Sequence, residues 1–172
     1  MAALRIRWCG EPARAHELAD FFARNVTDDI SYISHSELQG PRALSPTEWR
    51  QPLSRILLEE IEPRLADTLK EPVPGRNSKP ILVTEDDGLI ALSFVTFDCQ
   101  WVPHAIIEDL VVEPNRRSTG IGKAVMDWIA AEALARDIHR LMLESGLRNK
   151  RAHEFFAREG FITCSKVMMR EL

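Results

Sequence analysis

The chain has 172 residues, and its 22 lysines and arginines against 26 aspartates and glutamates give a formal net charge of −4. This length is typical of one domain with a sizeable core, and 45% hydrophobic with 28% charged residues argues against long disordered stretches. A slightly acidic chain lacks the basic face that broad nucleic-acid binding needs. We therefore expect one domain over residues 1–172, no nucleic-acid partner, and a weak preference for cationic partners.

The three cysteines, Cys9, Cys99 and Cys164, are far apart and form no C-x-x-C pair. This pattern favours free thiols in a reducing compartment over a disulfide framework or a zinc site. Arg5 and Arg7 interrupt the apolar N-terminus, so it is not a signal-peptide core, and no apolar run approaches the ~18–20 residues that span a bilayer. We expect a soluble cytoplasmic protein with no metal and no membrane contact.

The first part of the chain predicts a strand, a helix and an irregular segment. Residues 4–8 alternate apolar and basic side chains, which is the period-two pattern of a strand. Residues 13–26 place their apolar side chains near one helical face. Residues 27–44 are the least regular stretch, and loops of this length are often functional.

A second helical stretch is predicted over 45–70. It opens with Ser-Pro-Thr-Glu, which has capping-box spacing and places proline at the first helical position. Pro52 or Pro63 is expected to bend or break this helix. The proline- and glycine-rich residues 71–80 that follow predict a linker loop within the domain.

From residue 81 onward, strands and helices alternate. Two strands over 81–84 and 89–97, joined by an acidic turn at 86–88, predict a β-hairpin. The later elements are expected to be a strand over 105–112, a helix over 120–136, a short buried strand over 141–143, a helix over 149–158 and a closing strand over 167–169. This order favours an α+β fold, an α/β sandwich around a mostly antiparallel sheet.

The most informative stretch, residues 108–124, joins an apolar strand to the start of an amphipathic helix. The first turn of a helix leaves N–H groups unpaired and carries partial positive charge. Gly120 and Gly122 remove the side chains that would hold a ligand away from this backbone. The pattern suits an anion such as a pyrophosphate. The cationic side chains beside it are Arg116, Arg117 and Lys123.

Two commoner phosphate-binding motifs do not fit this stretch. A P-loop needs glycine five positions before Gly122 and serine or threonine after Lys123, where this chain has Arg117 and Ala124. A Rossmann fingerprint needs a third small residue where Val125 stands, and it follows the first strand of a βαβ unit. Both are excluded.

The pattern that fits is Arg-x-x-Gly-x-Gly over 117–122, which resembles the acetyl-coenzyme A-binding motif of the GNAT superfamily of N-acetyltransferases. The preceding Leu-Val-Val-Glu-Pro at 110–114 resembles the end of the family's fourth strand. Residues 149–161 are similar to the family's N-x-x-A-x-x-F-Y…G-F segment. The resemblance covers about residues 80–170, while the N-terminal half agrees only in its order of elements.

The resemblance implies a single acetyltransferase domain over 1–172, with a mixed, mostly antiparallel twisted sheet of about six to seven strands, flanked by helices and splayed at its central strands. It implies acetyl-CoA as cosubstrate, no metal, and acetyl transfer to a primary amine of a small molecule or peptide. Because family members are often dimers, a homodimer is among the assemblies that it allows.

The resemblance also assigns the coenzyme contacts. The backbone of the strand would pair with the pantetheine arm, the N–H groups of the following loop and helix would hold the pyrophosphate, and Asn149 would meet the coenzyme near its pantetheine or thioester end. Asn149 has an alternative role as the N-cap of its own helix. The implied coenzyme-binding residues are Leu110, Val111, Val112, Arg116, Arg117, Ser118, Thr119, Gly120, Ile121, Gly122, Lys123, Asn149 and Phe156.

Acetyl transfer to an amine needs a neutral nucleophile, and an aliphatic ammonium has a pKa of ~10.4, so a general base must accept a proton. The family often has a carboxylate at the position of Glu108, which we expect to be the base, with Asp109 as the alternative. Because successive strand residues face opposite sides, only one of the two can face the acetyl group fully. The backbone N–H of Val111 is expected to stabilise the oxyanion.

The leaving thiolate has no evident proton donor. Phe156 stands where many family members have a tyrosine, and phenylalanine cannot donate a proton. Departure without assistance or with water is tolerable for a thiol of pKa ~8.5, and His153, Tyr32 and Cys164 are the other donors. The missing tyrosine also leaves open a non-catalytic acyl-CoA-binding or regulatory module on the same fold.

The acceptor amine is expected to bind between the N-terminal helices and the late strands, with residues 27–44 as one wall. Trp101 and His104 precede the key strand and could line the mouth of this site. The acidic residues that could surround a cation are Asp28, Asp29, Glu37, Asp98 and Glu108.

Overall fold

The computed structural model describes residues 4–26, 52–68, 76–166 and 168. The chain divides into two units, the first comprising residues 1–26 and 51–143, the second residues 27–50 and 144–172. The expectation of one domain over 1–172 stays a prediction. The loop expected over 27–44 and the capping box at 45–48 lie outside the described residues.

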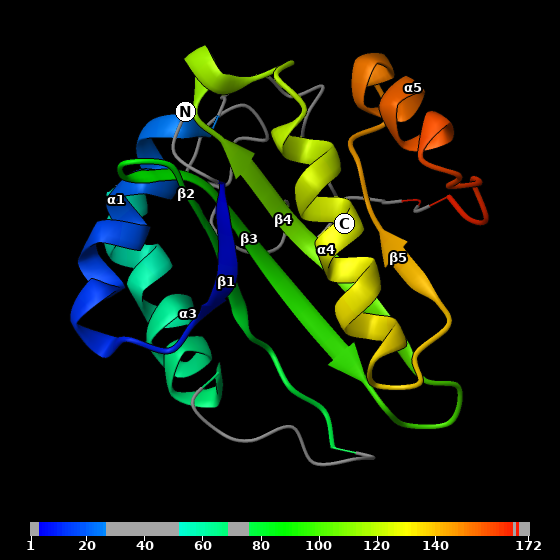
Figure 1. Cartoon of the computed structure of the whole chain (residues 1–172), viewed down its shortest axis with the longest axis horizontal. Helices are drawn as coiled ribbons and strands as arrows, with labels where there is room; N and C mark the ends of the chain where they lie inside the picture. Colours follow the sequence, from blue (N-terminus) through cyan, green and yellow to red (C-terminus); the bar gives the residue numbers. More distant parts are fainter. Residues whose placement is uncertain (1–3, 27–51, 69–75, 167, 169–172) are drawn as a thin grey trace. The chain divides into compact units, whose positions relative to one another are not determined.

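The first unit is built on a five-stranded sheet in the order β1-β2-β3-β4-β5 (Figure 1). Strands β1 to β4 are antiparallel to their neighbours, whereas β5 runs parallel to β4. The α+β class and the mostly antiparallel sheet are therefore confirmed. The strands are β1 (Arg5–Cys9), β2 (Ile81–Glu85), β3 (Leu89–Asp98), β4 (His104–Val112) and β5 (Leu141–Leu143).

The expectation of six to seven strands is wrong, because the sheet of the described residues has five. A strand needs a neighbour that pairs its N–H and C=O groups. Residues 161–166 form no ladder, and Met168, within the expected closing strand, is 92% exposed and belongs to no strand. Strand β5 is also less buried than predicted, since Met142 at its centre is 39% exposed.

The hairpin between β2 and β3 is confirmed. Its turn holds Asp87 at φ 54° and Gly88 at φ 157°, conformations that glycine and aspartate adopt more readily than most residues. The N–H of Asp86 donates to the carbonyl of Gly88 at 2.9 Å and closes the turn.

Helices cover both faces of the sheet. On one face, Phe22 of α1 (Ala15–Asn25) stacks on Phe94 of β3, with ring centroids 5.5 Å apart. On the other, Trp128 of α4 (Ile121–Leu134) packs edge-on against Trp8 at 4.8 Å, and Trp8 in turn contacts Phe97. Phe94 and Phe97 point to opposite faces because they lie three residues apart in one strand.

Helix α3 (Leu53–Thr68) lies on the same face as α1, where the Arg64 guanidinium rests over the Phe94 ring. The helix continues through Pro63 without a break, and of the two positions expected to bend or break it, Pro52 lies directly before its first residue. There the missing N–H of Pro52 removes no intrahelical bond. Among the described helices, none combines the length and apolar character needed to cross a membrane.

The described helix of the second unit is α5 (Lys150–Arg158). Its N-cap is Asn149, whose side-chain oxygen accepts the N–H of Ala152 at 3.2 Å. After the helix, Gly160 adopts φ 88°, which turns the chain so that the N–H of Phe161 reaches the carbonyl of Phe156 at 2.9 Å.

Two leucine-to-alanine variants test the packing of the first unit. Leu18 in α1 is 0% exposed, whereas Leu134 at the end of α4 is 58% exposed. We expect Leu18→Ala to lower the free energy of unfolding by about 2–5 kcal/mol, because it leaves a cavity. Leu134→Ala should change it by less than about 0.5 kcal/mol. Urea denaturation followed by circular dichroism measures both, and equal losses would contradict the packing of α1.

Candidate active site

A β-bulge interrupts β4 at Glu108. Phe94 of β3 is opposite Asp109, but the next residue, Val95, is opposite Ile107, so Glu108 has no partner in the register. Asp109 shares the face of its partner Phe94, and the Glu108 side chain contacts Arg64 on that same face. The strict alternation expected for successive residues therefore does not separate the two carboxylates, because the bulge inserts an extra residue.

Strand β4 loses one neighbour immediately beside this bulge. Its ladder with β5 pairs Ala105 with Leu141 and ends where Ile107 pairs with Leu143. Within the described residues, the edge of β4 from 108 to 112 has no strand beside it on this side, and β5 stops well short of the end of β4 in Figure 1. The ladder thus ends where the resemblance implied a splay of the central strands, and the splay itself stays a prediction.

The register determines which backbone groups face the open edge. The N–H of Glu113 donates to the carbonyl of Ile90 at 2.9 Å, so it points toward β3. Because N–H directions alternate along a strand, the N–H of Val111 also points toward β3, while those of Leu110 and Val112 point toward the open edge. The geometry thus favours Leu110 over Val111 as an oxyanion donor.

The chain then enters α4 through a helix start without a side-chain cap. Gly120 is the N-cap, at φ 91°, and the first helical bond runs from the Ala124 N–H to the Gly120 carbonyl at 3.0 Å. The N–H groups of Ile121 and Gly122 precede this bond and have no partner within the helix. A Cβ on Gly120 would meet no atom within 4 Å, so open space adjoins the positive end of the helix. These features fit a phosphate group.

The arginine side chains expected around the anion are bound to the protein. Arg117 donates through Nε to the carbonyl of Val112 at 2.9 Å and through Nη2 to the carbonyl of Asn25 at 2.8 Å. Arg116 forms an ion pair with Asp86 in the β2–β3 turn. These contacts shape the loop before α4, so the capacity for an anion lies mainly in the backbone.

Glu108 is held from two sides. Its Oε1 accepts the hydroxyl of Thr96 at 2.7 Å, and its Oε2 accepts Nη2 of Arg64. The Glu108 side chain is 28% exposed, whereas that of Arg64 is 5% exposed. Each carboxylate oxygen can accept a further hydrogen bond, so this anchored group is available to a ligand on its exposed side.

Sequence reasoning missed Arg64, although the pattern carries a signal for it. Leu57, Ile61 and Leu65 are buried and follow the spacing of one helical face, and Arg64 lies on the same face. A charged residue on an apolar face of a helix requires a buried partner. The position of that partner in the sequence could not be inferred.

The remaining expected residues lie in the second unit, outside the described residues, or at the far end of β4. Asn149 is the N-cap, as its alternative role predicted, and Phe156 contacts Phe155 and Phe161 within the second unit. Asp98 pairs in register with His104, at the end of β4 opposite to Val112. Trp101, in the connection between β3 and β4, is 99% exposed. Residues outside the described ranges are Asp28, Asp29, Tyr32 and Glu37.

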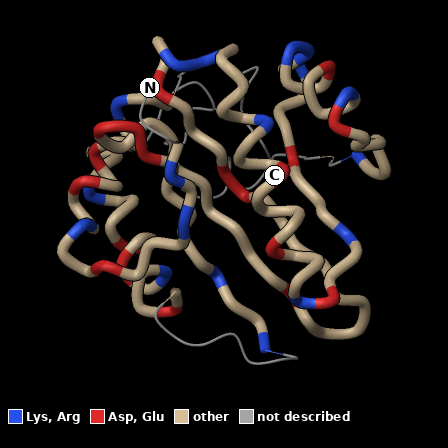
Figure 2. Tube along the Cα trace, viewed as in Figure 1, with Lys and Arg blue, Asp and Glu red and all other residues tan. Residues whose placement is uncertain are grey.

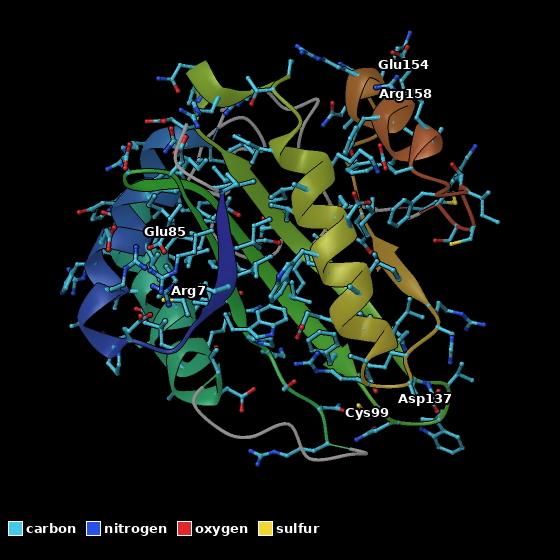
Figure 3. The ribbon with its side chains drawn as sticks, in the orientation of Figure 1. Arg7, Glu85, Cys99, Asp137, Glu154 and Arg158 are labelled. Carbon is cyan, nitrogen blue, oxygen red and sulfur yellow. The ribbon has the colours of Figure 1, made fainter. Side chains whose placement is uncertain are left out.

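Charges of both signs are mixed along the elements of each unit (Figure 2). Within the described residues, no group of three or more His, Cys, Asp or Glu side chains could hold a metal ion. One tight charge cluster surrounds Glu85, which pairs with Arg7 at 3.2 Å and Arg14 at 2.7 Å (Figure 3). This cluster links β1 and β2 to the start of α1.

Cys9 is buried beside that cluster and donates its thiol to Glu11 at 2.9 Å. Burial, together with this hydrogen bond, raises the pKa of Cys9 to about 11. The hydrogen bond from Arg7 lowers the pKa of the Glu11 carboxyl to about 2. Cys9 is therefore a protonated core residue at neutral pH.

We predict a loss of stability at alkaline pH through Cys9. Its folded pKa lies above the ~8.5 of an unfolded thiol, so the unfolded state releases the proton first as the pH rises. The contribution is complete below about pH 8 and is lost as the pH approaches 11. Between pH 8 and 10.5, wild type should lose about 2 kcal/mol more unfolding free energy than Cys9→Ala. Urea denaturation at both pH values measures this, and Cys164→Ala should behave like wild type.

The model of the acetyltransferase (GNAT) family matches residues 47–161, more than half of the chain. The chain belongs to the GNAT acetyltransferase family. The resemblance carried by Arg-x-x-Gly-x-Gly at 117–122 is thereby confirmed.

One curated relative is an uncharacterized N-acetyltransferase of Methanocaldococcus jannaschii, 34% identical over 96 residues. The match covers 48% of this chain and 42% of that protein, so the chain spans less than half the length of this relative. Its sequence supports the same assignment to N-acetyltransferases and says nothing of an acceptor.

Solved structures show the same fold. AAC(6')-Iy, in complex with the bisubstrate analogue CoA-S-monomethyl-acetylneamine, has a TM-score of 0.69 at 12% identity, over 99% of each chain. A protein of Clostridium acetobutylicum described as a predicted acetyltransferase, solved with acetyl-CoA, has a TM-score of 0.66 at 16% identity, over 98% of this chain and 96% of that one. A ribosomal-protein-alanine N-acetyltransferase from Brucella melitensis biovar Abortus 2308 scores 0.64 at 16% identity, over 99% of this chain and 100% of that one. At these identities the likeness shows the fold alone.

Proposed function

We propose that this GNAT protein is an acetyl-CoA-dependent N-acetyltransferase that acetylates a primary amine of a small molecule or peptide. The observation that carries the proposal is the open edge of β4 beyond Ile107. It begins at an anchored carboxylate, Glu108, and leads directly into the uncapped helix start at Gly120. One continuous segment thus presents a base, an unpaired backbone edge and an anion-binding helix terminus.

The residues present fit acetyl-CoA. The N–H groups of Ile121 and Gly122 would hold its diphosphate, since the space beside Gly120 is open. The N–H of Val112 would donate to an amide carbonyl of its pantetheine arm. When bound, acetyl-CoA supplies an activated acetyl thioester. Arg117 holds the open edge of β4 and the helix start at Gly120 in place, because it ties the end of β4 to the loop before α4.

The chain's own residues would carry the proton. An acceptor ammonium must lose its proton before it can attack a carbonyl, and Glu108 would accept it directly or through water. The N–H of Leu110 would donate to the developing oxyanion, in place of Val111. Phe156 cannot protonate the leaving thiolate. We therefore propose that the thiolate leaves without a proton donor or takes a proton from water.

The proposal is tested by incubating the protein with acetyl-CoA and a panel of primary amines, with mass spectrometry of the products. The panel contains a polyamine, an aminoglycoside, an amino acid, a lysine peptide and a peptide with a free N-terminus. Acetylation of one class supports the proposal. Coenzyme binding without acetylation of any amine would instead indicate an acyl-CoA-binding or regulatory module, which Phe156 in place of the family's tyrosine favours.

Coenzyme binding should depend on the helix start at Gly120. Any L-residue is strained at φ 91°, so Gly120→Ala serves as the control for strain. We expect Gly120→Ala to weaken acetyl-CoA binding about tenfold or less, and Gly120→Glu to weaken it at least about 100-fold, because it adds a negative charge at an anion site. Isothermal titration calorimetry measures both. Equal affinities of the two variants would contradict the placement of the phosphates.

The two carboxylates of the bulge should differ in effect. We expect Glu108→Gln to lower kcat about 100-fold or more, because a positioned general base contributes about 10²–10⁴-fold. Asp109→Asn should lower it less than about fivefold if Glu108 is the base. The affinity for acetyl-CoA should stay within about twofold in both variants. The reverse order of effects would assign the proton transfer to Asp109.

A further inference from the structure

Arg64 of α3 contacts the β4 bulge from several sides. Its guanidinium lies over the Phe94 ring, 5.0 Å from the centroid, and Phe94 is opposite Asp109. Its Nη1 lies 3.5 Å from the carbonyl of Val95, which is opposite Ile107. Its Nη2 binds Glu108, the extra residue between these two pairs. The side chain thus meets the bulge itself and both flanking pairs.

The charge balance leaves Glu108 partly uncompensated. Nε and Nη2 of Arg64 also bind Oε1 of Glu60, at 3.1 and 2.7 Å. One cation therefore serves two carboxylates, and the group of three has a formal charge of −1. The Glu60 side chain is 44% exposed and that of Glu108 28%, so both carboxylates reach the solvent while the cation does not. Such an arrangement attracts a further cation, such as an ammonium group.

The backbone of Arg64 is itself fixed to the sheet. Its carbonyl accepts the hydroxyl of Thr68 at 2.7 Å, and the same hydroxyl oxygen accepts the N–H of Ile81, the first residue of β2, at 3.2 Å. The N–H of Lys79 donates to Asp67 at 2.7 Å. The last turn of α3 is therefore bound to the start of β2, and the guanidinium extends from an anchored position.

We propose that Arg64 is a positioning residue of the acetyl transfer, which together with Thr96 fixes the Glu108 carboxylate in one orientation and leaves its exposed lone pairs for the acceptor amine. The planar guanidinium fork suits this task, because several donors in fixed directions restrict a carboxylate more than the single ammonium of lysine. Removing one partner of a buried ion pair also lowers stability, so the test needs a readout that a merely structural role would not change. The inference rests on the proposed function.

The test is a double-variant cycle of Arg64→Met and Glu108→Gln, with Arg55→Met as the matched control for loss of an exposed arginine of α3. We expect Arg64→Met to lower kcat about 10–100-fold, part of the effect of the base through which it acts. The KM and Kd for acetyl-CoA should stay within about twofold. Arg64→Lys should retain an intermediate kcat, and guanidinium ion should restore part of the activity of Arg64→Ala but none of Glu108→Gln. Arg55→Met should match wild type.

The decisive comparison is made in the Glu108→Gln background. If Arg64 acts through Glu108, Arg64→Met added to Glu108→Gln lowers kcat no further, because the group that it positions is already absent. This comparison holds even where Arg64→Met alone folds poorly, since the double variant removes both charges of the buried pair. A further loss of tenfold or more in the double variant, or no rescue by guanidinium, overturns the inference. A wild-type protein that acetylates no amine contradicts the proposed function itself, whatever the variants do.

Discussion

Beyond Ile107, strand β4 has a neighbouring strand on one side only among the residues that the structure describes, and most of the candidate site depends on this loss of pairing. Backbone N–H and C=O groups without a ladder partner must bind a side chain, water or a ligand, and the carbonyl of Val112 binds Arg117. Residues 108–112 therefore have a chemical role that their mostly apolar side chains do not reveal. The bulge at Glu108 occurs at the same point and sets a carboxylate at the start of the open edge. One irregularity in strand pairing thus combines an acid–base group with a hydrogen-bonding edge.

Around the start of α4, the arginine side chains bind the protein itself, and the backbone is left for an anion. Arg116 and Arg117 bind Asp86 and backbone carbonyls, and so hold the loop in shape. The anion-binding capacity lies in N–H groups of the first helical turn, exposed by the absence of a capping side chain at Gly120. A backbone site of this kind is preorganised, because its donors are positioned by the helix whether or not a ligand is present.

Helix α3 belongs to the site through a single buried cation. Arg64 brings the charge of an otherwise apolar helix face against the bulge, where Glu60 and Glu108 share it. Burying a guanidinium is unfavourable unless its donors are satisfied, and Arg64 satisfies them with two carboxylates and a carbonyl. The geometry of the carboxylate is accordingly coupled to the packing of α3 on the sheet. The GNAT family membership explains the coenzyme segment, whereas this contact belongs to residues outside the motif.

The sequence by itself determined the features whose causes are local. The acidic turn at 86–88, the glycine start of α4 and the cap at Asn149 follow from conformational preferences and hydrogen bonds within a few residues. The motif at 117–122, together with the segments at 110–114 and 149–161, was sufficient to identify the family. Tertiary structure alone decided the bulge at Glu108, the direction of the Val111 N–H and the partner of Arg64. These features depend on how segments that are far apart in the chain pair with one another. A shift of one residue in the strand register would turn each side chain of a strand to the other face of the sheet.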